Sequence, residues 1–482
     1  MTTILIASPV RQDPLVLAEF LKSLDRLVQN SFRAEFAFID DNLDPVSSTL
    51  LEEFAASHPK VTLLSPDAAR FGDYARSHYT HQWTDEAIWK VAAFKDSFIQ
   101  LALEGEFDHL FLVDSDLVLH PFTVEQLLRA KKNIISEIFW TAWQPGCRPD
   151  PQVWVSDEYT LYRRQGREAL SEEEINQRTA EFLDQLRTPG VYEVGGLGAC
   201  TLLSRTALHV GVRFKRIKNL SFWGEDRHFC IRAAALGFEL YVDTHLPAYH
   251  VYRNAELDGV ASYVRRCDDE ISRFVYESDP RITSMVWPLP KNWWSRGHEY
   301  GWAQHFVSKE HVVLDAACGV SHPFKFWLAK NAMECHACDL DPRIVDDEAL
   351  QRDVRLDFGI QEEEIAILGN LYRTQQDITH LNYPDAAFDR VFCISVLEHM
   401  PGRDIERALG EFRRVLKPGG LAVLTFDVPP LDPASIARAV ERSGLGFAGP
   451  LDLRRDVDER ALTTPMYGGL ACFRTVLRKA SP

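Results

Sequence analysis

Continuous apolar runs alternate with helical patterns along the first half of the chain. Residues Leu110–Val113 are apolar without interruption, which is typical of a strand buried on both faces. Similar runs predict strands at residues 3–8, 36–39 and 61–64, and the spacing of Leu17, Leu21, Leu24 and Val28 predicts a helix. This alternation predicts a mostly parallel sheet, with ligands gathered at the carboxyl ends of its strands.

A second alternating pattern occupies the last third of the chain. Short apolar strands are predicted at residues 312–315, 334–338, 388–395 and 421–427. The fold class is therefore α/β, with two doubly wound domains at residues 1–255 and 305–482. Residues 256–304 mix charged residues with prolines and tryptophans. We expect them to form a helix and a packed connector, because flexible tethers are poor in aromatic residues.

Composition narrows the class of protein. A chain of 482 residues exceeds what one core usually supports, which agrees with two domains. The net charge of −17 argues against a nucleic-acid-binding surface. We find no signal-peptide pattern and no transmembrane segment, so a cytoplasmic location is expected. The nine cysteines lie mainly in apolar contexts, which favours reduced, buried thiols.

Pairs of aspartates follow two of the predicted strands in the first domain. Asp40 and Asp41 end one strand, and Asp114 and Asp116 follow the buried run at 110–113. Two carboxylates at one strand end can share a divalent cation, since Mg²⁺ and Mn²⁺ prefer hard oxygen ligands and keep positions open for phosphate. The alternative is an aspartate-rich turn, which is common after strands.

Further candidate residues come later in the first domain. Three glycines at 195, 196 and 198 adjoin a strand, where the backbone could approach a ligand closely. Glu225 and Asp226 open a helix after Trp223 and Gly224, where they could also serve as capping acids. His250 follows a strand and is a candidate metal ligand, for which His245 and His228 compete.

In this order, these motifs resemble the nucleotide-sugar glycosyltransferases of the GT-A fold, in particular the family-2-like group. The resemblance implies that Asp41, with Asp40 beside it, contacts the nucleotide of a nucleotide diphosphate sugar. It implies that Asp116, helped by Asp114, binds Mn²⁺ or Mg²⁺ on the diphosphate, and that His250 completes the metal sphere. We expect Asp226, paired with Glu225, to act as general base on the acceptor hydroxyl, which gives direct displacement with inversion.

The second domain resembles the class I S-adenosylmethionine-dependent methyltransferases. The matching features are Asp315 at the end of the first strand, Asp339 after the second, Asp377, and the L-K-P-G-G helix stop. The resemblance implies that the loop at Gly319 passes under the methionine moiety, that Asp339 binds the ribose hydroxyls and that Asp377 lies by the adenine. Ala317 and Ser321 stand where the family usually has glycines. Glu398 and His399 lie at a suitable strand end for a base.

These observations lead to one main hypothesis and two alternatives. The main one is a bifunctional enzyme that transfers a sugar to a glycan or glycoconjugate acceptor and methylates the same glycan. In the first alternative, the second domain is a non-catalytic binding module that has lost cofactor affinity through Ala317 and Ser321. In the second, the first domain is an inactive acceptor-binding platform.

Overall fold

The computed structural model describes residues 1–66, 84–156, 158–220, 224–360, 369–455 and 460–480. It divides into two compact units, residues Met1–Arg265 and Arg266–Pro482. Each hydrophobic core in the described residues draws its side chains from one unit. None of the described helices is both long enough and apolar enough to cross a membrane.

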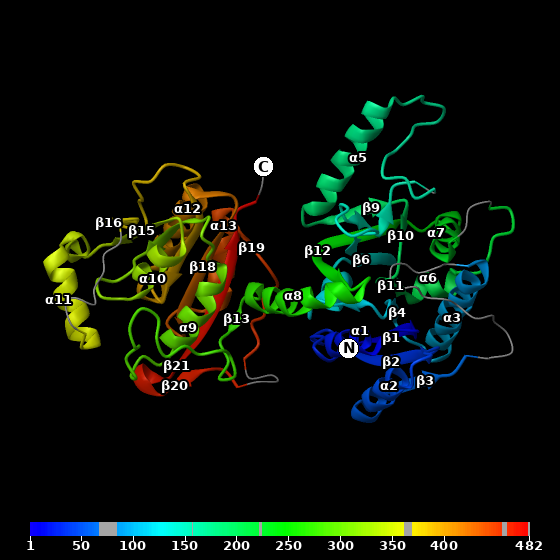
Figure 1. Cartoon of the computed structure of the whole chain (residues 1–482), viewed down its shortest axis with the longest axis horizontal. Helices are drawn as coiled ribbons and strands as arrows, with labels where there is room; N and C mark the ends of the chain where they lie inside the picture. The colour runs from blue at the N-terminus through cyan, green and yellow to red at the C-terminus, as the bar shows by residue number, and fades with distance from the viewer. Residues whose placement is uncertain (67–83, 157, 221–223, 361–368, 456–459, 481–482) are drawn as a thin grey trace. The chain divides into compact units, whose positions relative to one another are not determined.

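The first unit is an α/β structure built around a sheet in the order β3-β2-β1-β4-β11-β6-β12-β5 (Figure 1). Its main strands are β1 (Thr2–Val10), β2 (Phe32–Asp40), β3 (Val61–Leu64), β4 (His109–Leu112), β5 (Leu117–Val118), β6 (Ile134–Thr141), β11 (Thr201–Ser204) and β12 (Leu240–His250). Short strands β7 (Asp150–Pro151), β8 (Val153–Trp154), β9 (Val191–Val194) and β10 (Gly196–Leu197) complete the unit.

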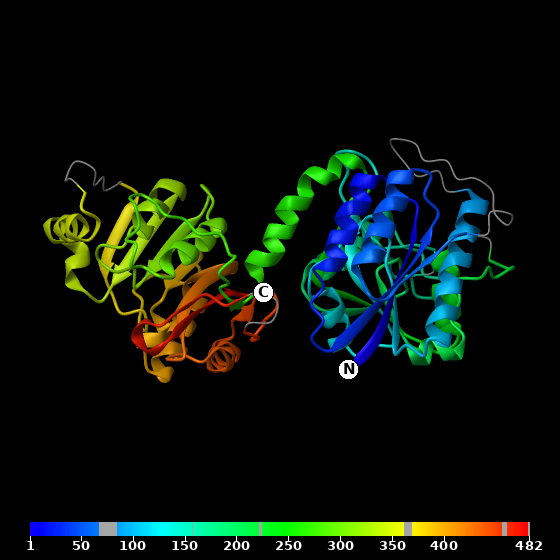
Figure 2. The ribbon, with the colours of Figure 1, turned by 90° about the horizontal axis from the view of Figure 1, so that it is seen from below.

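The predicted parallel order is present among the early strands. β1 pairs in parallel with both β2 and β4, and β1 and β2 can be followed side by side, in blue, in Figure 2. β11 runs antiparallel between β4 and β6, so the sheet is mixed from that point. The helices are α1 (Pro14–Asp25), α2 (Pro45–Ser57), α3 (Asp85–Glu104), α4 (Thr123–Arg129), α5 (Glu172–Arg187), α6 (Arg205–Val210) and α7 (Glu225–Ala235).

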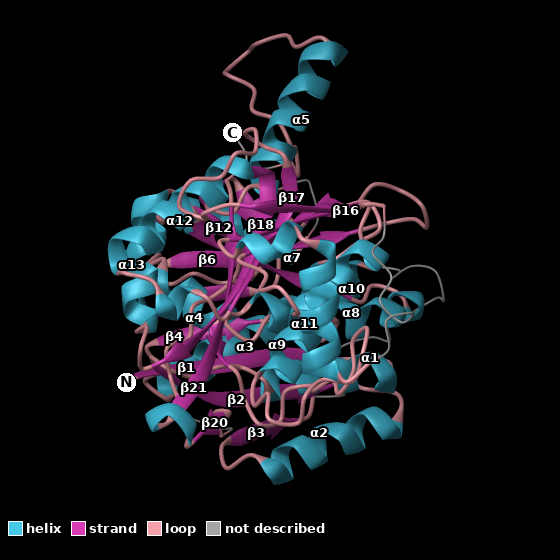
Figure 3. Cartoon of the chain, turned by 90° about the vertical axis from the view of Figure 1, so that its left-hand side faces the viewer, coloured by secondary structure: helices cyan, strands magenta, loops and turns pink. Residues whose placement is uncertain are grey.

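Helix α5 differs from its neighbours in burial. It extends away from the strands of its unit in Figures 1 and 3, and along its length only Leu183 and Leu186 are buried. A capping box between Ser171 and Glu174 begins it, because each residue's side chain binds the other's backbone N–H. Most of helix α5 is therefore exposed or only partly buried.

The second unit is a doubly wound sheet in the order β13-β21-β18-β17-β14-β15-β16. The strands are β13 (Arg273–Phe274), β14 (Val312–Ala316), β15 (Glu334–Asp339), β16 (Leu371–Gln375), β17 (Phe388–Ile394), β18 (Leu416–Val428) and β21 (Leu470–Arg478), with β19 (Gly446–Phe447) and β20 (Thr463–Thr464) beside β21. The helices are α9 (Arg296–Ala303), α10 (Phe324–Asn331), α11 (Asp347–Phe358), α12 (Gly402–Val415) and α13 (Pro433–Ser443). β14 to β18 pair in parallel, and β21 runs antiparallel to β18.

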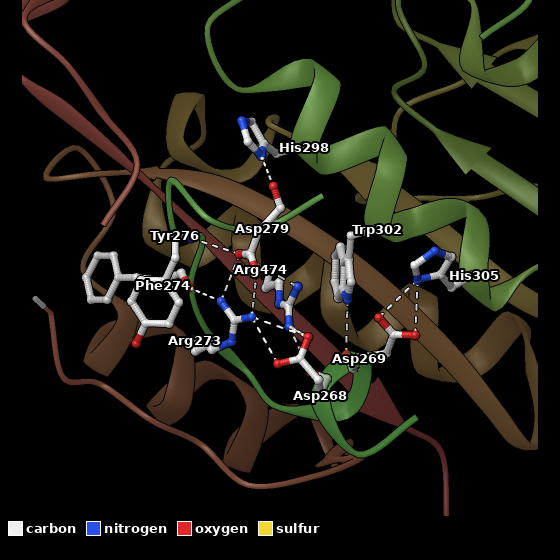
Figure 4. A network of polar contacts seen from close by, with 10 residues as sticks. All are labelled: Asp268, Asp269, Arg273, Phe274, Tyr276, Asp279, His298, Trp302, His305 and Arg474. Carbon is white, nitrogen blue, oxygen red and sulfur yellow. Dashed lines mark hydrogen bonds and ion pairs between the residues drawn. The ribbon is translucent and has the colours of Figure 1, made fainter. Parts of the chain in front are cut away.

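Most of the segment that the sequence analysis set apart as a connector belongs to the second unit. Helix α8 (Leu257–Glu270) leads into it. Figure 4 shows the network that fixes the segment: Arg273 binds Asp279 at 2.7 Å, and Arg474 of β21 binds Asp268 at 2.9 Å. Both guanidinium groups are buried, so each needs these carboxylates to offset its lost hydration.

Candidate active sites

A cavity of about 660 Å³ in the first unit gathers residues that are far apart in the sequence. Its lining includes these candidates from the sequence analysis: Asp41, Asp114, Asp116, Glu225, Asp226 and His250. The carboxylate of Asp40 instead accepts hydrogen bonds from the backbone and the side-chain amide of Asn42, which shape the turn after β2. Trp223 lies outside the described residues.

Strand pairing brings His250 to the aspartates. β5 pairs with the end of β12, which sets His250 opposite Leu117 and leaves its Nε2 atom 3.5 Å from Asp116 Oδ2. The other ring nitrogen, Nδ1, lies 2.8 Å from the hydroxyl of Thr141. A hydrogen bond at one imidazole nitrogen orients the other for a metal ion. Carboxylate oxygens are the ligands that Mn²⁺ and Mg²⁺ prefer, whereas an imidazole nitrogen is a softer ligand.

The two competing histidines have other partners. His245 binds the buried carboxylate of Asp243 at 2.8 Å. His228 accepts a hydrogen bond from the backbone N–H of Ile217 at 2.9 Å. Of these three histidines, His250 is therefore the one whose ring lies beside Asp116.

Lys95 of α3 is a central residue that sequence reasoning missed. Its buried ammonium group binds Glu225 at 2.9 Å and Asp226 at 2.8 Å. The two acids therefore bind a side chain from another helix, in contrast to the capping role that was their alternative. The sequence did carry one sign of this role. Lys95 lies on the apolar face of α3 with Ile88 and Ile99, where a charged residue is unusual.

Burial and charge oppose each other at these carboxylates. Burial raises the pKa of Asp226 to about 7, although the ammonium of Lys95 acts to lower it. Burial likewise raises the pKa of Asp114 to about 6, again against Lys95. A carboxylate with a pKa near neutrality can take up and release a proton at physiological pH.

Cations and aromatic rings form other parts of the lining. Lys90 binds Asp41 at 2.7 Å, and Arg11 lies 3.5 Å from the same carboxylate. The rings of Trp154 and Tyr159 have centroids 4.5 Å apart. The cavity lining thus combines charged groups with aromatic rings, as is common in small-molecule binding sites.

The glycines before β11 differ in what they do. A Cβ on Gly196 would lie 2.0 Å from the ring of Trp154, and one on Gly195 would lie 2.0 Å from the carbonyl oxygen of Val155. These two glycines permit close packing of the chain against itself. Gly198 lines the cavity. Of the three glycines, it is the one at which the backbone could approach a ligand closely.

A second cavity, of about 170 Å³, lies at the carboxyl ends of β14 and β15 in the second unit. Asp315, Gly319 and Asp339 line it, together with Ala317. Asp339 Oδ2 accepts a hydrogen bond from the backbone N–H of Gly319 at 2.8 Å. The loop after β14 is thus tied to the acid at the end of β15.

Asp315 has an incomplete set of partners. It is 2% exposed, and its Oδ2 atom has no hydrogen-bond partner among the described residues. Burial raises its pKa to about 7, against the nearby ammonium of Lys325. An unpaired buried carboxylate oxygen is costly unless a ligand supplies a donor, so the residues present fit a bound cofactor with N–H or O–H groups.

Residues 314–424 match the protein family described as a methyltransferase domain. The second unit contains a class I S-adenosylmethionine-dependent methyltransferase domain. The match covers β14 to β18, which carry the second cavity and its acids.

Similar proteins align with only part of this chain. Methyltransferase GfsG from Streptomyces halstedii is 32% identical over 114 residues, which are 24% of this chain and 37% of that protein. Sterol 24-C-methyltransferase erg-4 from Neurospora crassa is 31% identical over 126 residues, 26% of this chain and 30% of that protein. The chain thus spans about a third of the length of these relatives. The crystal structure of YcgJ from Bacillus subtilis aligns at 17% identity with a TM-score of 0.28, covering 38% of this chain and 99% of that one.

Asp377 occupies a different position from the other acids of the methyltransferase domain. Its carboxylate accepts hydrogen bonds from the backbone N–H and the hydroxyl of Thr379, both at 2.8 Å. It is exposed and is absent from the described lining of the second cavity. Its contact with adenine stays a prediction.

Two further acids of the second unit, Glu299 and Glu398, interact electrostatically with Arg296. Arg296 lines the cavity and pairs with the fully buried Glu299 at 2.5 Å. Burial raises the pKa of Glu398 to about 8, and neither carboxylate oxygen has a partner in the described part of the chain. Arg296 and Glu299 lie in the predicted connector, residues 256–304, in which no sequence motif indicates a site.

Proposed function

We propose that the second unit transfers a methyl group from S-adenosylmethionine to an acceptor. The observation that carries this proposal is the buried carboxylate of Asp315, whose Oδ2 atom has no hydrogen-bond partner among the described residues. It lies in a cavity that Asp339 and Gly319 also line. When bound, S-adenosylmethionine supplies an electrophilic methyl group on a sulfonium. Asp315 and Asp339 would hold the cofactor through its N–H and O–H groups, and Glu398 is the candidate to take up the acceptor's proton.

Titration calorimetry with S-adenosylhomocysteine tests this proposal. The wild-type chain should bind it, and Asp339→Asn should weaken binding by about tenfold or more, because a charged acceptor of hydrogen bonds is lost. Asp432→Asn is a suitable control, since Asp432 caps helix α13 with its side chain. Absence of any heat with the wild type would favour the alternative of a non-catalytic binding module.

We also propose that the first unit is a metal-dependent glycosyltransferase with a GT-A fold. Convergence of Asp41, Asp116, Asp226 and His250 on one cavity favours it. A divalent ion held by Asp116, Asp114 and His250 would neutralise charge on a leaving nucleotide diphosphate. Asp226 would take the proton of the acceptor hydroxyl, which corresponds to inversion at the sugar carbon. The acceptor class that we propose is a glycan or glycoconjugate.

A thermal-shift screen of UDP-, GDP-, CDP- and dTDP-sugars, with and without Mn²⁺, tests the glycosyltransferase proposal. A matching donor should raise the unfolding temperature only when the ion is present. Asp116→Asn should abolish the ion-dependent part of the shift, and Asp25→Asn, at the exposed end of α1, should retain it. Donor binding that is equal with and without the ion would contradict the metal role.

Both activities on one chain lead us to propose that they act on the same glycan. The order of the reactions can be tested by supplying the purified chain with donor sugar, acceptor and labelled S-adenosylmethionine. Label should enter the glycosylated product. Label that enters no product of the first unit would separate the two activities.

A further inference from the structure

Lys325 lies in an unusual place for a lysine. It is 0% exposed and belongs to the first turn of α10. The helix dipole is unfavourable to a cation at that end, and burial of an ammonium group is costly unless it is well bonded. Its retention therefore requires specific partners.

Those partners are two carbonyl groups of the loop between β14 and α10. The ammonium of Lys325 donates to the carbonyl oxygens of Gly319 and His322, each at 2.7 Å. Burial lowers the pKa of Lys325, while the Cys318 thiol and the carboxylate of Asp315 oppose this effect. The lysine thus binds the backbone of the loop that lines the cavity.

The opposite side of the loop is tied to β15. The N–H of Gly319 donates to Asp339, and the N–H of Cys318 donates to the carbonyl oxygen of Cys338 at 3.0 Å. His322 lies 2.9 Å from the hydroxyl of Tyr300 through its Nδ1 atom. The backbone of the loop is therefore held on both faces while it lines the cavity.

This loop contains a strained residue. Ala317 has a φ of 53°, in the left-handed region that glycine adopts easily and that costs a residue with a Cβ. Gly319, two residues on, has a φ of 63°. A loop that carries alanine at such a position needs other contacts to keep its shape.

We propose that Lys325 is a positioning residue for the cofactor, which holds the loop 317–322 in the binding conformation that a glycine at position 317 would adopt without strain. The inference rests on the proposed methyltransferase function. Lys325 is expected to act through the loop carbonyls, without touching the cofactor.

Calorimetry with S-adenosylhomocysteine measures the effect of replacing Lys325. Lys325→Met should raise the dissociation constant about tenfold or more, since two charge-assisted hydrogen bonds are lost. Lys325→Gln should show a smaller rise, because its shorter side chain still offers an N–H donor to the loop. Lys330→Met, on the exposed side of the same helix, should bind as the wild type does.

A double-mutant cycle separates positioning from general stability. Ala317→Gly removes the strain, so the loss caused by Lys325→Met should shrink at least about threefold in that background. Near-ultraviolet circular dichroism would verify that each variant is folded. If Lys325→Met does not fold, the same cycle with Lys325→Gln gives the comparison.

The outcomes distinguish this inference from the function on which it rests. An equal loss in both backgrounds, or wild-type affinity in folded Lys325→Met, would overturn the positioning role while leaving the methyltransferase proposal intact. Failure of the wild-type chain to bind S-adenosylhomocysteine would overturn both.

Discussion

At the scale of single residues, Lys95 is a buried cation that binds Glu225 and Asp226, two acids of the first cavity's lining. Burial alone would lower its pKa, but the charges of Asp226, Glu225 and Asp114 outweigh that effect and raise it well above its ordinary value. Lys95 is therefore a permanent cation. It favours the ionised form of the carboxylates around it, which a general base requires.

If the first unit transfers a sugar as proposed, the pH dependence of that reaction should depend on the pair of Lys95 and Asp226. In the proposed reaction Asp226 would act as a base only when ionised. Because its pKa is about 7, release of nucleotide diphosphate should fall as the pH drops through about 7. Lys95→Met removes the opposing cation and raises the pKa of Asp226 further. Initial rates between about pH 5 and 9 should therefore show a midpoint moved to higher pH.

The control for that measurement is Lys60→Met. Lys60 pairs with Glu35 at the surface, so its loss should leave the midpoint in place. A midpoint that is the same in Lys95→Met and in the wild type would remove Asp226 from the role of base.

At the scale of elements, the pairing of β6 with β12 contains a buried carboxyl. Glu137 of β6 is 0% exposed and accepts a hydrogen bond from the N–H of Leu246, where the register of β12 shifts. Its Oε2 atom has no partner among the described residues. Burial, followed by the charge of Asp243, raises the pKa of Glu137 well above its ordinary value.

This carboxyl should make the first unit less stable as the pH rises above the unfolded pKa of Glu137. Because its pKa is raised on folding, the stability that protonated Glu137 contributes is complete below its unfolded pKa and is lost as pH rises toward the folded one. The slope is at most about 1.4 kcal/mol per pH unit for one proton. Glu137→Gln should flatten the decline, as measured by urea unfolding at a series of pH values. A slope equal to that of the wild type would mean that Glu137 does not titrate in this range.

At the scale of the whole molecule, the second unit includes residues that precede the matched methyltransferase family. Arg474 of β21 is 2% exposed and depends on Asp268, and the indole N–H of Trp302 donates to the carbonyl oxygen of Asp269 at 3.1 Å (Figure 4). Residues 266–304 therefore complete a buried network together with the last strand.

Two fragments test where the second unit begins. Residues 266–482 should fold and unfold cooperatively. A fragment of residues 305–482 leaves Arg474 buried without Asp268, which should cost about 3–5 kcal/mol, and it also lacks Tyr300 and Trp302 from the core. Circular dichroism melting should show a cooperative transition for the longer fragment only. Equal stability of the two would place the boundary at the end of the predicted connector.

The sequence by itself determined the α/β class of the chain and the methyltransferase character of the second unit. It did so because buried strands are continuous apolar runs, and because acids such as Asp315 and Asp339 lie at the carboxyl ends of their strands. Those signals are local. They also placed Asp114, Asp116, Glu225 and Asp226, which line the first cavity.

Only the tertiary structure decided which separate segments meet. Pairing of β5 with β12 places His250, and not His245, beside Asp116. Packing of α3 against α7 brings Lys95 within hydrogen-bonding distance of Asp226. The same holds for Lys325 and the carbonyls of its loop. The residues next to a buried charge in the sequence do not reveal its partner. The partner is determined by the register of strands and by the packing of helices that are distant in sequence.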